Sequence, residues 1–548
     1  MSNFLKSDRL KRMQAARPFV AGKVFEAVNA VKLLEAVLRP GDKVNIEGDN
    51  QKQADFLADC LCKVNKDLVH DLHMVQSAIA LDSHLDVFER GIATKVDFSF
   101  SGPQAERLAR FVQEGKIQLG SIHTYLELYA RYFMDLTPRV AMTAAYQADR
   151  HGNLYTGFNT EDTPVVIEAT KFKQGIVIAQ VNEIVDKLPR VDIPGDWVDF
   201  VVQAPTPFYI EPLFTRDPAL ITDAQVLRAM IAIKGIYAEY GVQRLNHGIG
   251  FDTAAIELLL PTYGEELGLK GKICSYFALN PHPTLIPAIE SGWVKSIYCF
   301  GGELGMEDYV KARSDIFFTG PDDSLRSNRA YGQMAGHYAI DMFIGGTLQI
   351  DKYGNSSTAT DDRIAGAGGA PNMGCDPHGR RHASEAWLKC GAEDVLQTGL
   401  RGGMPRGRRL VVQLQETFRE KWAPGFVDTL DAIKLAELAD LPIPPVMIYG
   451  DDLSHIVTEE GVAYLNRCSS LEERMAAIRA VAGYTELGLS AKESETADLR
   501  SRGIVKTPED LNINIATANR SLLAAKNVRD LVKCSGGIYQ PPARFRNW

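Results

Sequence analysis

The sequence lacks the signatures of several large protein classes. It contains no run of about 18 uncharged apolar residues, the length needed to span a bilayer. Residues 1–9 carry charges, but no apolar segment follows them as it does in a secretory signal. The phosphate-binding GxxxxGK(S/T), a GxGxxG after a strand, the GxSxG nucleophile elbow and zinc-ligand spacings are all missing. We therefore expect a cytoplasmic protein with no membrane contact, no metal and no cofactor of its own.

An excess of positive charge is also missing, and the cysteines form no recognisable set. The net charge is −9, which disfavours nucleic acid as a general partner. The eight cysteines include no CxxC pair, so we expect reduced and mostly buried thiols. What the chain does have is an ordinary globular balance over 548 residues, 45% of them hydrophobic and 24% charged. This length predicts roughly two to four domains.

One internal repeat organises the chain. Residues 145–153 read AYQADRHGN and residues 347–355 read TLQIDKYGN, so the motif Q-x-D-x-x-G-N recurs after 202 residues. Each copy follows an apolar run, at 140–144 and at 342–346. The pattern is typical of a buried strand, then an Asp-initiated turn, then a Gly-Asn pair that can adopt positive φ. Two unrelated turns of similar chemistry are the alternative.

Strand and helix patterns alternate along both halves, which indicates α/β layers. Short buried strands are expected at 44–46, 176–179 and 410–414. A helix capped by Asp223 is expected to run to about residue 240, because apolar residues recur on one face.

Proline marks the junction between the halves. Four prolines fall between residues 205 and 222, and after about residue 430 the pattern becomes more helical and more charged. We therefore predict two tandem open α/β/α domains related by the repeat, with a mainly helical C-terminal extension packed on the second domain. The predicted bounds are 1–215, 216–465 and 466–548.

The repeat and its surroundings resemble the CoA transferases. In the first half the resemblance rests on residues 99–115 and 140–185, which include ADRHGNL at 148–154. In the second half the matching stretches are LNHGIG (245–250), GTLQID (346–351), GAGGAPNM (366–373) and HIVTEEGVA (455–463). Within this family the chain looks most like the α subunits of malonate decarboxylase, and more distantly like those of citrate lyase.

The resemblance implies a fold, a reaction and partners. The fold is two CoA-transferase-like domains in tandem. The reaction is an exchange on a carrier thiol, in which acetyl-S-carrier and malonate give malonyl-S-carrier and acetate. The thiol belongs to the CoA-like phosphoribosyl-dephospho-CoA group of a partner acyl carrier protein (ACP). Other subunits of the complex then decarboxylate the malonyl-S-ACP.

A glycine-rich loop at 366–370 is the best candidate for the reacting centre. Missing side chains let the backbone approach a thioester, and backbone N–H groups can stabilise an oxyanion. In the family the matching glycines help to form the oxyanion site. A tight turn without a ligand is the alternative. The candidate catalytic residues here are Gly368, Gly369 and Ala370, and the candidate binding residues are Gly366 and Asn372.

Many CoA transferases use a glutamate as a covalent relay, in an E-x-G-x-x-G motif. The matching stretch here is IYCFGGELG at 297–305, which places Phe300 at the relay position. Because phenylalanine is no nucleophile, the sequence favours direct exchange between the two acyl groups. Four further candidates stay open: Gly302 and Glu303 for catalysis, and Asn280 and His282, which an ungapped alternative alignment brings near the site.

The second carboxylate of malonate needs a partner, and arginine binds carboxylates through two parallel hydrogen bonds. Two basic runs qualify, at 378–382 and 401–409, with a solvated loop as the alternative for each. The first run is nearer the glycine-rich loop, and the second suits a protein partner. In the opening of the second half, His247 could donate to a carboxylate. The binding candidates are Arg380, Arg381, Asn246, His247, Gly248, Gly250, Gly346 and Gln349.

Four other functions stay open on the sequence. A CoA transferase of family I type would act on free acyl-CoA through Glu303, and a citrate-lyase-like ACP transferase would exchange a different acid. A thioesterase-like hydrolase would pass the acyl group to water. A non-catalytic scaffold is disfavoured because the glycine-rich loop is intact.

Overall fold

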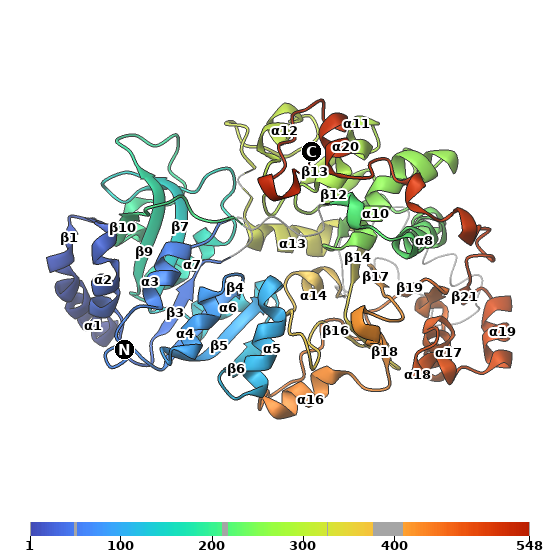
Figure 1. Ribbon diagram of the computed structural model, residues 1–548, viewed down its shortest axis with the longest axis horizontal. Helices are drawn as coiled ribbons and strands as arrows, with labels where there is room; N and C mark the ends of the chain where they lie inside the picture. The colour runs from blue at the N-terminus through green and yellow to red at the C-terminus, as the bar shows by residue number, and fades with distance from the viewer. Residues whose placement is uncertain (1, 49–51, 211–216, 326, 376–408, 547) are drawn as a thin grey trace.

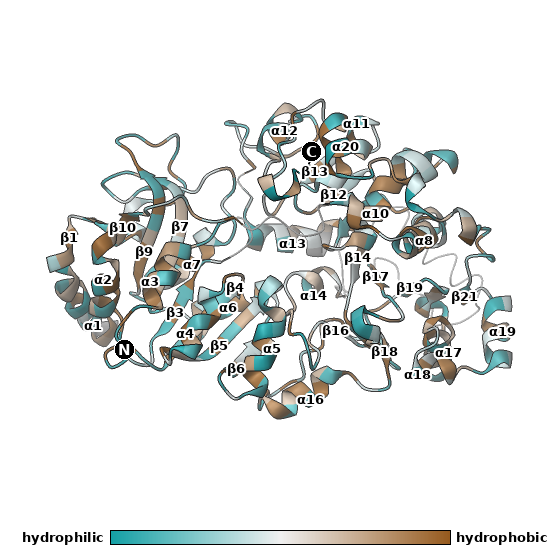
Figure 2. Ribbon diagram, in the orientation of Figure 1, coloured by the Kyte–Doolittle hydropathy of each residue, from teal (hydrophilic) through white to brown (hydrophobic). Residues whose placement is uncertain are grey.

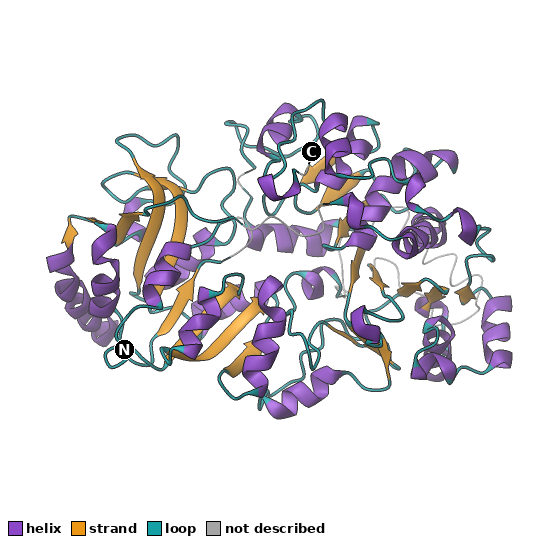
Figure 3. Ribbon diagram, viewed as in Figure 1, coloured by secondary structure: helices purple, strands orange, loops and turns teal. Residues whose placement is uncertain are grey.

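The computed structural model describes residues 2–48, 52–210, 217–325, 327–375, 409–546 and 548. Within these ranges the chain forms two α/β halves, each built around a mainly parallel sheet, which follow one another along the long axis of the molecule (Figures 1 and 3). The predicted fold class, two tandem α/β domains with a mainly helical C-terminal part, is confirmed.

The sheet of the first half contains the strands expected at 44–46 and 176–179, as β3 and β9. Strand β1 pairs antiparallel with β2, and β8 (Leu154–Tyr155) pairs antiparallel with β7; the other pairs are parallel. From edge to edge the strands are β1 (Val20–Ala21), β2 (Val24–Phe25), β10 (Phe200–Gln203), β9 (Ile176–Ile184), β7 (Val140–Ala148), β3 (Lys43–Ile46), β4 (Leu72–Ala78), β5 (Ala93–Phe100) and β6 (Gln118–Ile122).

Both faces of this sheet are covered, because neighbouring residues of a strand point to opposite sides. Met142 of β7 belongs to the apolar cluster that helices α1 to α5 cover. Its neighbour Ala141 belongs to the cluster on the other face, which α6 and α7 cover. Along α5 hydrophobic and hydrophilic residues alternate, as an amphipathic surface helix requires (Figure 2). The helices are α1 (Ser2–Ala16), α2 (Ala30–Val37), α3 (Asp55–Leu61), α4 (Ser83–Glu89), α5 (Ala105–Gln113), α6 (Tyr125–Met134) and α7 (Thr163–Phe172).

The second sheet contains the strand expected at 410–414, as β17. It is parallel from β13 to β19, and the last two strands are antiparallel. In order they are β13 (Ser296–Tyr298), β12 (Tyr276–Ala278), β11 (Arg244–His247), β14 (Met342–Gly346), β17 (Leu410–Leu414), β19 (His455–Thr458), β20 (Gly461–Tyr464) and β21 (Val505–Lys506). A small separate sheet joins β16 (Ser356–Ser357), β15 (Gln349–Asp351) and β18 (Phe426–Val427).

Residues beyond 465 are mainly helical, but they also supply β21 to the second sheet and Leu511, Val528 and Leu531 to its core. The domain bounds at 215 and 465 stay predictions. Besides the helical segment at 223–240, the described α-helices of this half are α10 (Phe251–Leu259), α11 (Ile286–Glu290), α12 (Glu307–Ala312), α13 (Arg329–Ala339), α14 (Ala370–Met373), α16 (Asp431–Leu438), α17 (Leu471–Val481), α18 (Glu486–Leu489), α19 (Glu493–Ser501) and α20 (Val528–Cys534).

The long helix expected after the proline-rich junction is confirmed, but its predicted cap is wrong. It consists of α8 (Asp223–Ala232), a π-helical turn (Ile233–Tyr237) and α9 (Ala238–Tyr240). Thr222, not Asp223, is the cap: its hydroxyl accepts from the N–H of Gln225 at 3.3 Å, and the Gln225 side chain accepts from the N–H of Thr222 at 2.9 Å. Threonine followed by glutamine three residues later forms this reciprocal pair, which leaves Asp223 inside the helix.

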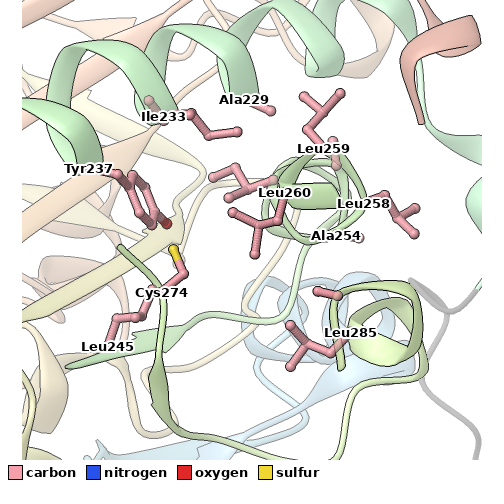
Figure 4. Packing of buried hydrophobic residues seen from close by; sticks show 14 of the residues in the cluster. Ala229, Ile233, Tyr237, Leu245, Ala254, Leu258, Leu259, Leu260, Cys274 and Leu285 are labelled. Atoms are coloured by element: carbon pink, nitrogen blue, oxygen red, sulfur yellow. The ribbon is translucent and has the colours of Figure 1, made fainter. Parts of the chain in front are cut away.

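The core of the second half lies between α8, α10 and the sheet. Ala229 and Ile233 meet Leu258 and Leu259 there, above Leu245 of β11, as Figure 4 shows. All five side chains are fully buried. Because this packing fixes α10, it also fixes the loop at its N-terminus, which follows directly on β11.

The repeated motif folds into the same turn twice. In the first copy the carboxylate of Asp149 accepts from the N–H groups two and four residues later, at 2.9 and 3.0 Å. In the second copy Asp351 does the same at 2.9 Å for both. Gly152 and Gly354 have φ of 84° and 86°, which favours glycine. The turn chemistry expected for both copies is therefore confirmed. A common origin of the two copies stays a prediction, since the first follows β7 of the large sheet and the second follows β15 of the small sheet.

Helix α13 and the segments around it join the halves. It packs against α6 of the first half and α14 of the second, and it lies between the two sheets in Figure 1. Gly332 permits this approach, since a Cβ there would lie 1.7 Å from the Cβ of Phe300. Ala359, Ile364 and Leu435 from the second half complete the apolar core of the first. The two halves thus share buried surface.

None of the helices within the described ranges is long and apolar enough to cross a membrane. The cysteines in these ranges are free thiols, and the buried ones are Cys60, Cys62, Cys274 and Cys299.

Candidate active site

A cavity of about 250 Å³ lies where the two halves meet. The first half contributes Ala78 and Phe100, at the carboxyl ends of β4 and β5, together with Tyr125 at the start of α6. The second half contributes residues at or just after the carboxyl ends of β11, β12, β13 and β14, and the glycine-rich loop. Ligands of α/β proteins bind at such carboxyl ends, so the cavity is the natural candidate for an active site.

The glycine-rich loop is held against the first half by its backbone. The N–H of Gly368 donates to the carbonyl of Ser99 at 2.9 Å, and the carbonyl of Gly368 accepts from the N–H of Tyr125 at 3.1 Å. Gly366 has φ of 81°, and a Cβ there would lie 2.3 Å from the Ser99 carbonyl oxygen. Glycine is therefore required for the loop to reach β5 at all.

The glycine-rich loop leads into α14, and backbone N–H groups at this helix start have no hydrogen-bond acceptor within the described residues. Gly369 is the N-cap of α14, and the first N–H groups of a helix have no acceptor within it. Within the described residues the N–H groups of Gly369 and Ala370 find no acceptor elsewhere either. Both residues line the cavity. Two donors are thus available to an oxyanion at this point.

A buried carboxylate holds two of the lining histidines. Nδ1 of His247 and Nδ1 of His282 each lie 2.9 Å from Oε1 of Glu257, and Nε2 of His247 lies 2.9 Å from the hydroxyl of Tyr237. Burial alone would raise the pKa of Glu257, but the two histidines outweigh it and hold that pKa well below its usual range. Both ring nitrogens of His247 are used inside the protein, so the arrangement gives it no nitrogen for a substrate carboxylate.

The relay position faces the cavity, but Glu303 does not. Phe300 lines the cavity, whereas Glu303 lies outside the lining and is 2% exposed. Gly302 is also outside the lining, and its N–H donates to Oε1 of Glu161 at 2.9 Å. None of the described lining residues carries a carboxylate.

These features agree with one family. The sequence model for "malonate decarboxylase, alpha subunit, transporter" matches residues 3–548. The chain belongs to the malonate decarboxylase α-subunit family. A relative from Malonomonas rubra named acetyl-S-ACP:malonate ACP transferase is 69% identical over 545 residues, which cover 99% of this chain and 98% of the relative. The predicted family is confirmed, and so is the prediction that the chain is an enzyme.

Solved structures agree with this assignment. A malonate decarboxylase α subunit from Acinetobacter baumannii is 55% identical with a TM-score of 0.93, covering 99% of this chain and 100% of that one. A Pseudomonas malonate decarboxylase hetero-tetramer in complex with malonate contains a chain that is 56% identical with a TM-score of 0.94, covering 99% of each. An acyl-CoA transferase from Escherichia coli O157:H7 shares only the fold, at 14% identity and a TM-score of 0.52, covering 82% of this chain and 89% of that one.

The cavity of this α subunit brings together many of the residues predicted from its sequence, while others lie elsewhere. Gln349 exchanges two hydrogen bonds with Asp431, at 2.8 and 3.0 Å. Asn372 accepts from the N–H of Leu126 through its side chain at 3.5 Å, and Gly250 caps α10 outside the lining. Those that line the cavity are Asn246, His247, Gly248, Asn280, His282, Gly346, Gly366, Gly368, Gly369 and Ala370.

Most residues of the two predicted basic runs lie outside the described residues. Arg380 and Arg381 lie outside the described residues, as does the second run up to residue 408. Arg409, the last residue of that run, is buried and donates to the carbonyls of Met373 and, at 3.0 Å, Gly336. It therefore ties β17 to α13 and α14 and does not face a protein partner.

Sequence reasoning missed the charged side of the cavity. Arg329 and Gln333 of α13 line it, and a ring contact places the Arg329 guanidinium 4.8 Å from the centre of Tyr125. Nη2 of Arg329 lies 2.6 Å from Oε2 of Glu161, a fully buried residue at φ of 48°. One feature of the sequence could have pointed to Arg329: among the eleven residues of α13, it is the one with a permanently charged side chain. No group of three or more His, Cys, Asp or Glu in the described ranges is arranged to hold a metal ion.

A histidine pair shares a carboxylate, and one of the two, His123, lies at the carboxyl side of β6, just before α6 in the chain. Nε2 of His123 and Nε2 of His73 lie 2.7 and 2.6 Å from the two oxygens of Asp97. Burial alone would lower the pKa of His123, but its hydrogen bonds to Asp97 and Glu127 outweigh burial and raise it. Burial likewise would raise the pKa of Asp97, but the two histidines hold it well below its usual range.

These shifts predict a pH-dependent contribution to stability. A raised pKa in the folded state means that protonated His123 stabilises fully below about pH 6.5, its unfolded value, and less as pH rises through the folded value. His123→Gln is therefore expected to lower the melting temperature more at pH 6 than at pH 9, by differential scanning calorimetry. An equal loss at both pH values would show that His123 is not protonated in the folded protein.

Proposed function

We propose that this α subunit transfers an ACP thiol between two acids, so that acetyl-S-ACP and malonate give malonyl-S-ACP and acetate. The proposal is supported by the relative that is 69% identical over nearly its whole length and is named for this reaction. The carrier's CoA-like prosthetic group is then the substrate, and the chain itself holds no cofactor. Decarboxylase subunits would take the malonyl-S-ACP onward, since a related α subunit occurs in a malonate decarboxylase hetero-tetramer.

The chemistry needs oriented substrates and stabilised oxyanions. A malonate oxygen attacks the thioester carbonyl of acetyl-S-ACP, the C–S bond breaks, and a mixed anhydride and a thiolate form. The thiolate then attacks the malonyl carbonyl of the anhydride, and acetate leaves. Each attack places negative charge on a carbonyl oxygen, and the N–H groups of Gly369 and Ala370 are the available donors for it.

One observation favours direct exchange over a covalent enzyme intermediate. Among the described lining residues no side chain carries a carboxylate, and Phe300 stands at the relay position. Glu303 is buried outside the lining, and the N–H of the preceding residue, Gly302, donates to Glu161. A family I CoA transferase acting through Glu303 would need this carboxylate inside the cavity. A citrate-lyase-like transferase would use the same exchange with another acid, and the name of the curated relative favours malonate.

Borohydride trapping tests the direct exchange. The protein is mixed with acetyl-S-ACP or with acetyl-CoA, treated with borohydride and analysed by intact-protein mass spectrometry. We expect no reduced adduct on the enzyme, together with malonate-dependent release of acetate from acetyl-S-ACP. The Glu303→Gln variant should behave as the wild type. A reduced glutamyl thioester that maps to Glu303 and disappears in this variant would establish the covalent mechanism.

A further inference from the structure

Helix α13 places a guanidinium and a carboxamide on the same wall of the cavity. Arg329 and Gln333 are four residues apart, so their side chains lie one above the other on one face of the helix. Both line the cavity, and they are 8% and 2% exposed. Arg329 is the one permanently charged side chain among the lining residues that the structure describes.

The carboxamide of Gln333 is not satisfied by the protein. Its oxygen is buried and has no hydrogen-bond partner within the described part of the chain. A buried amide without a partner is destabilising, and buried polar groups in folded proteins are nearly always paired. A carboxylate only accepts hydrogen bonds, so it would bind the NH2 group of this amide rather than the oxygen. The orphaned oxygen shows that no hydrogen bond to it from the described residues fixes the amide in one orientation.

Arg329 is held in place from behind. Oε2 of Glu161 lies 2.6 Å from Nη2 of Arg329, and the ring of Tyr125 lies against the guanidinium. The other oxygen of Glu161 accepts from the N–H of Gly302. Because Glu161 is fully buried and held by both neighbours, the guanidinium has a fixed position in the wall. Such a preorganised fork suits a carboxylate.

The carboxamide of Gln333 lies close to the backbone of Gly369, where the oxyanion donors are. A Cβ at Gly369 would lie 2.4 Å from Nε2 and 2.7 Å from the oxygen of Gln333, so the loop backbone and this carboxamide are in direct contact. A carboxylate bound at Gln333 is thus next to the donors of Gly369 and Ala370. Only a short spacer can join it to a second carboxyl group at those donors, and the single methylene of malonate is such a spacer.

We propose that Arg329 and Gln333 bind the non-reacting carboxylate of a short dicarboxylic acid, and so determine which acid accepts the carrier thiol. This inference rests on the proposed function and names the specificity determinants of the same cavity. The second carboxylate of malonate can accept from the Arg329 guanidinium and from the NH2 group of Gln333, whereas acetate has no second carboxylate to offer them. The wall therefore favours binding of malonate at the start of the exchange and release of acetate at its end.

The test compares two reactions in the same variants. One is formation of malonyl-S-ACP from acetyl-S-ACP and malonate, and the other is exchange of labelled acetate into acetyl-S-ACP. Gln333→Met keeps the length of the side chain and removes its polar atoms. We expect this variant to raise KM for malonate about tenfold or more, with the acetate exchange rate and the melting temperature unchanged.

Arg329 is replaced together with Glu161, the carboxylate that it contacts. The double variant Arg329→Met/Glu161→Gln leaves no unpaired carboxylate behind, and it should raise KM for malonate about 100-fold or more while acetate exchange persists. Tyr331→Ala is the matched control, because Tyr331 is exposed on the same helix and lies outside the cavity. This control should have wild-type kinetics in both reactions.

Two outcomes overturn the inference, and they differ from failure of the proposed function. An unchanged KM for malonate in Gln333→Met and in the double variant would remove both residues from substrate binding. A parallel loss of both reactions would assign them a general structural role. If the wild-type protein itself forms no malonyl-S-ACP but still exchanges acetate, the proposed function fails, and the acid that restores turnover identifies the true substrate.

Discussion

Gly369→Val is expected to abolish acyl exchange while the protein stays folded. Gly369 has φ of −92°, an ordinary value for any residue, so valine brings no backbone strain. Its side chain would instead press on the carboxamide of Gln333, the flexible end of a side chain that can move aside. We expect destabilisation of about 1–3 kcal/mol from overpacking. Exchange should fall by about 100-fold or more, because the oxyanion donors and Gln333 are displaced together.

Steady-state rates of malonyl-S-ACP formation and a thermal melt check this result together. Gly250→Ala is the control, since Gly250 lies outside the cavity, has φ of 177°, and has only the Thr253 hydroxyl, at 3.8 Å, near a new Cβ. It should keep nearly full activity. If Gly369→Val lowers expression, the smaller Gly369→Ala provides the same comparison. More than half of wild-type activity in folded Gly369→Val would remove this loop from the reacting centre.

The glycine-rich wall of the cavity could be predicted from the sequence, because a close backbone approach or a positive φ requires glycine and so shows in the residue types. The loop approaches β5 so closely that only glycine fits at Gly366, and the positive φ of Gly368 also favours glycine. The paired turns at Asp149 and Asp351 were equally visible, since each residue of the motif supplies a specific hydrogen bond or φ value. Local chemistry of this kind does not depend on the rest of the fold.

The opposite wall could not be predicted, because its residues come together only through tertiary structure. Ala78, Phe100 and Tyr125 are ordinary residues in the sequence, and they reach the cavity because β4 and β5 end, and α6 begins, at the seam between the halves. Arg329 and Gln333 face the substrate side because glycines let α13 pack against Phe300 and α14. The surroundings of His247 were equally invisible in the sequence: it lines the cavity as expected, but its two ring nitrogens contact Glu257 and Tyr237.

Glu161→Ala is expected to destabilise the protein by about 3–5 kcal/mol, the usual cost of removing one partner of a buried ion pair. The carboxylate of Glu161 is fully buried at the seam, where one oxygen accepts from Gly302 and the other from Arg329. Its removal leaves a buried guanidinium without this counter-charge and a buried N–H without this acceptor. Glu161→Gln keeps an acceptor oxygen in nearly the same place, so its loss should be clearly smaller.

A double-mutant cycle separates the pair from its surroundings. Thermal unfolding is compared for the wild type, Glu161→Ala, Arg329→Met and the double variant. We expect the double variant to be more stable than Glu161→Ala alone, because the uncompensated charge is then absent. Additive losses would mean that Glu161 stabilises the seam through Gly302 rather than through Arg329. In that case the guanidinium would owe its position to the ring of Tyr125, and Tyr125→Leu would become the variant that disturbs malonate binding.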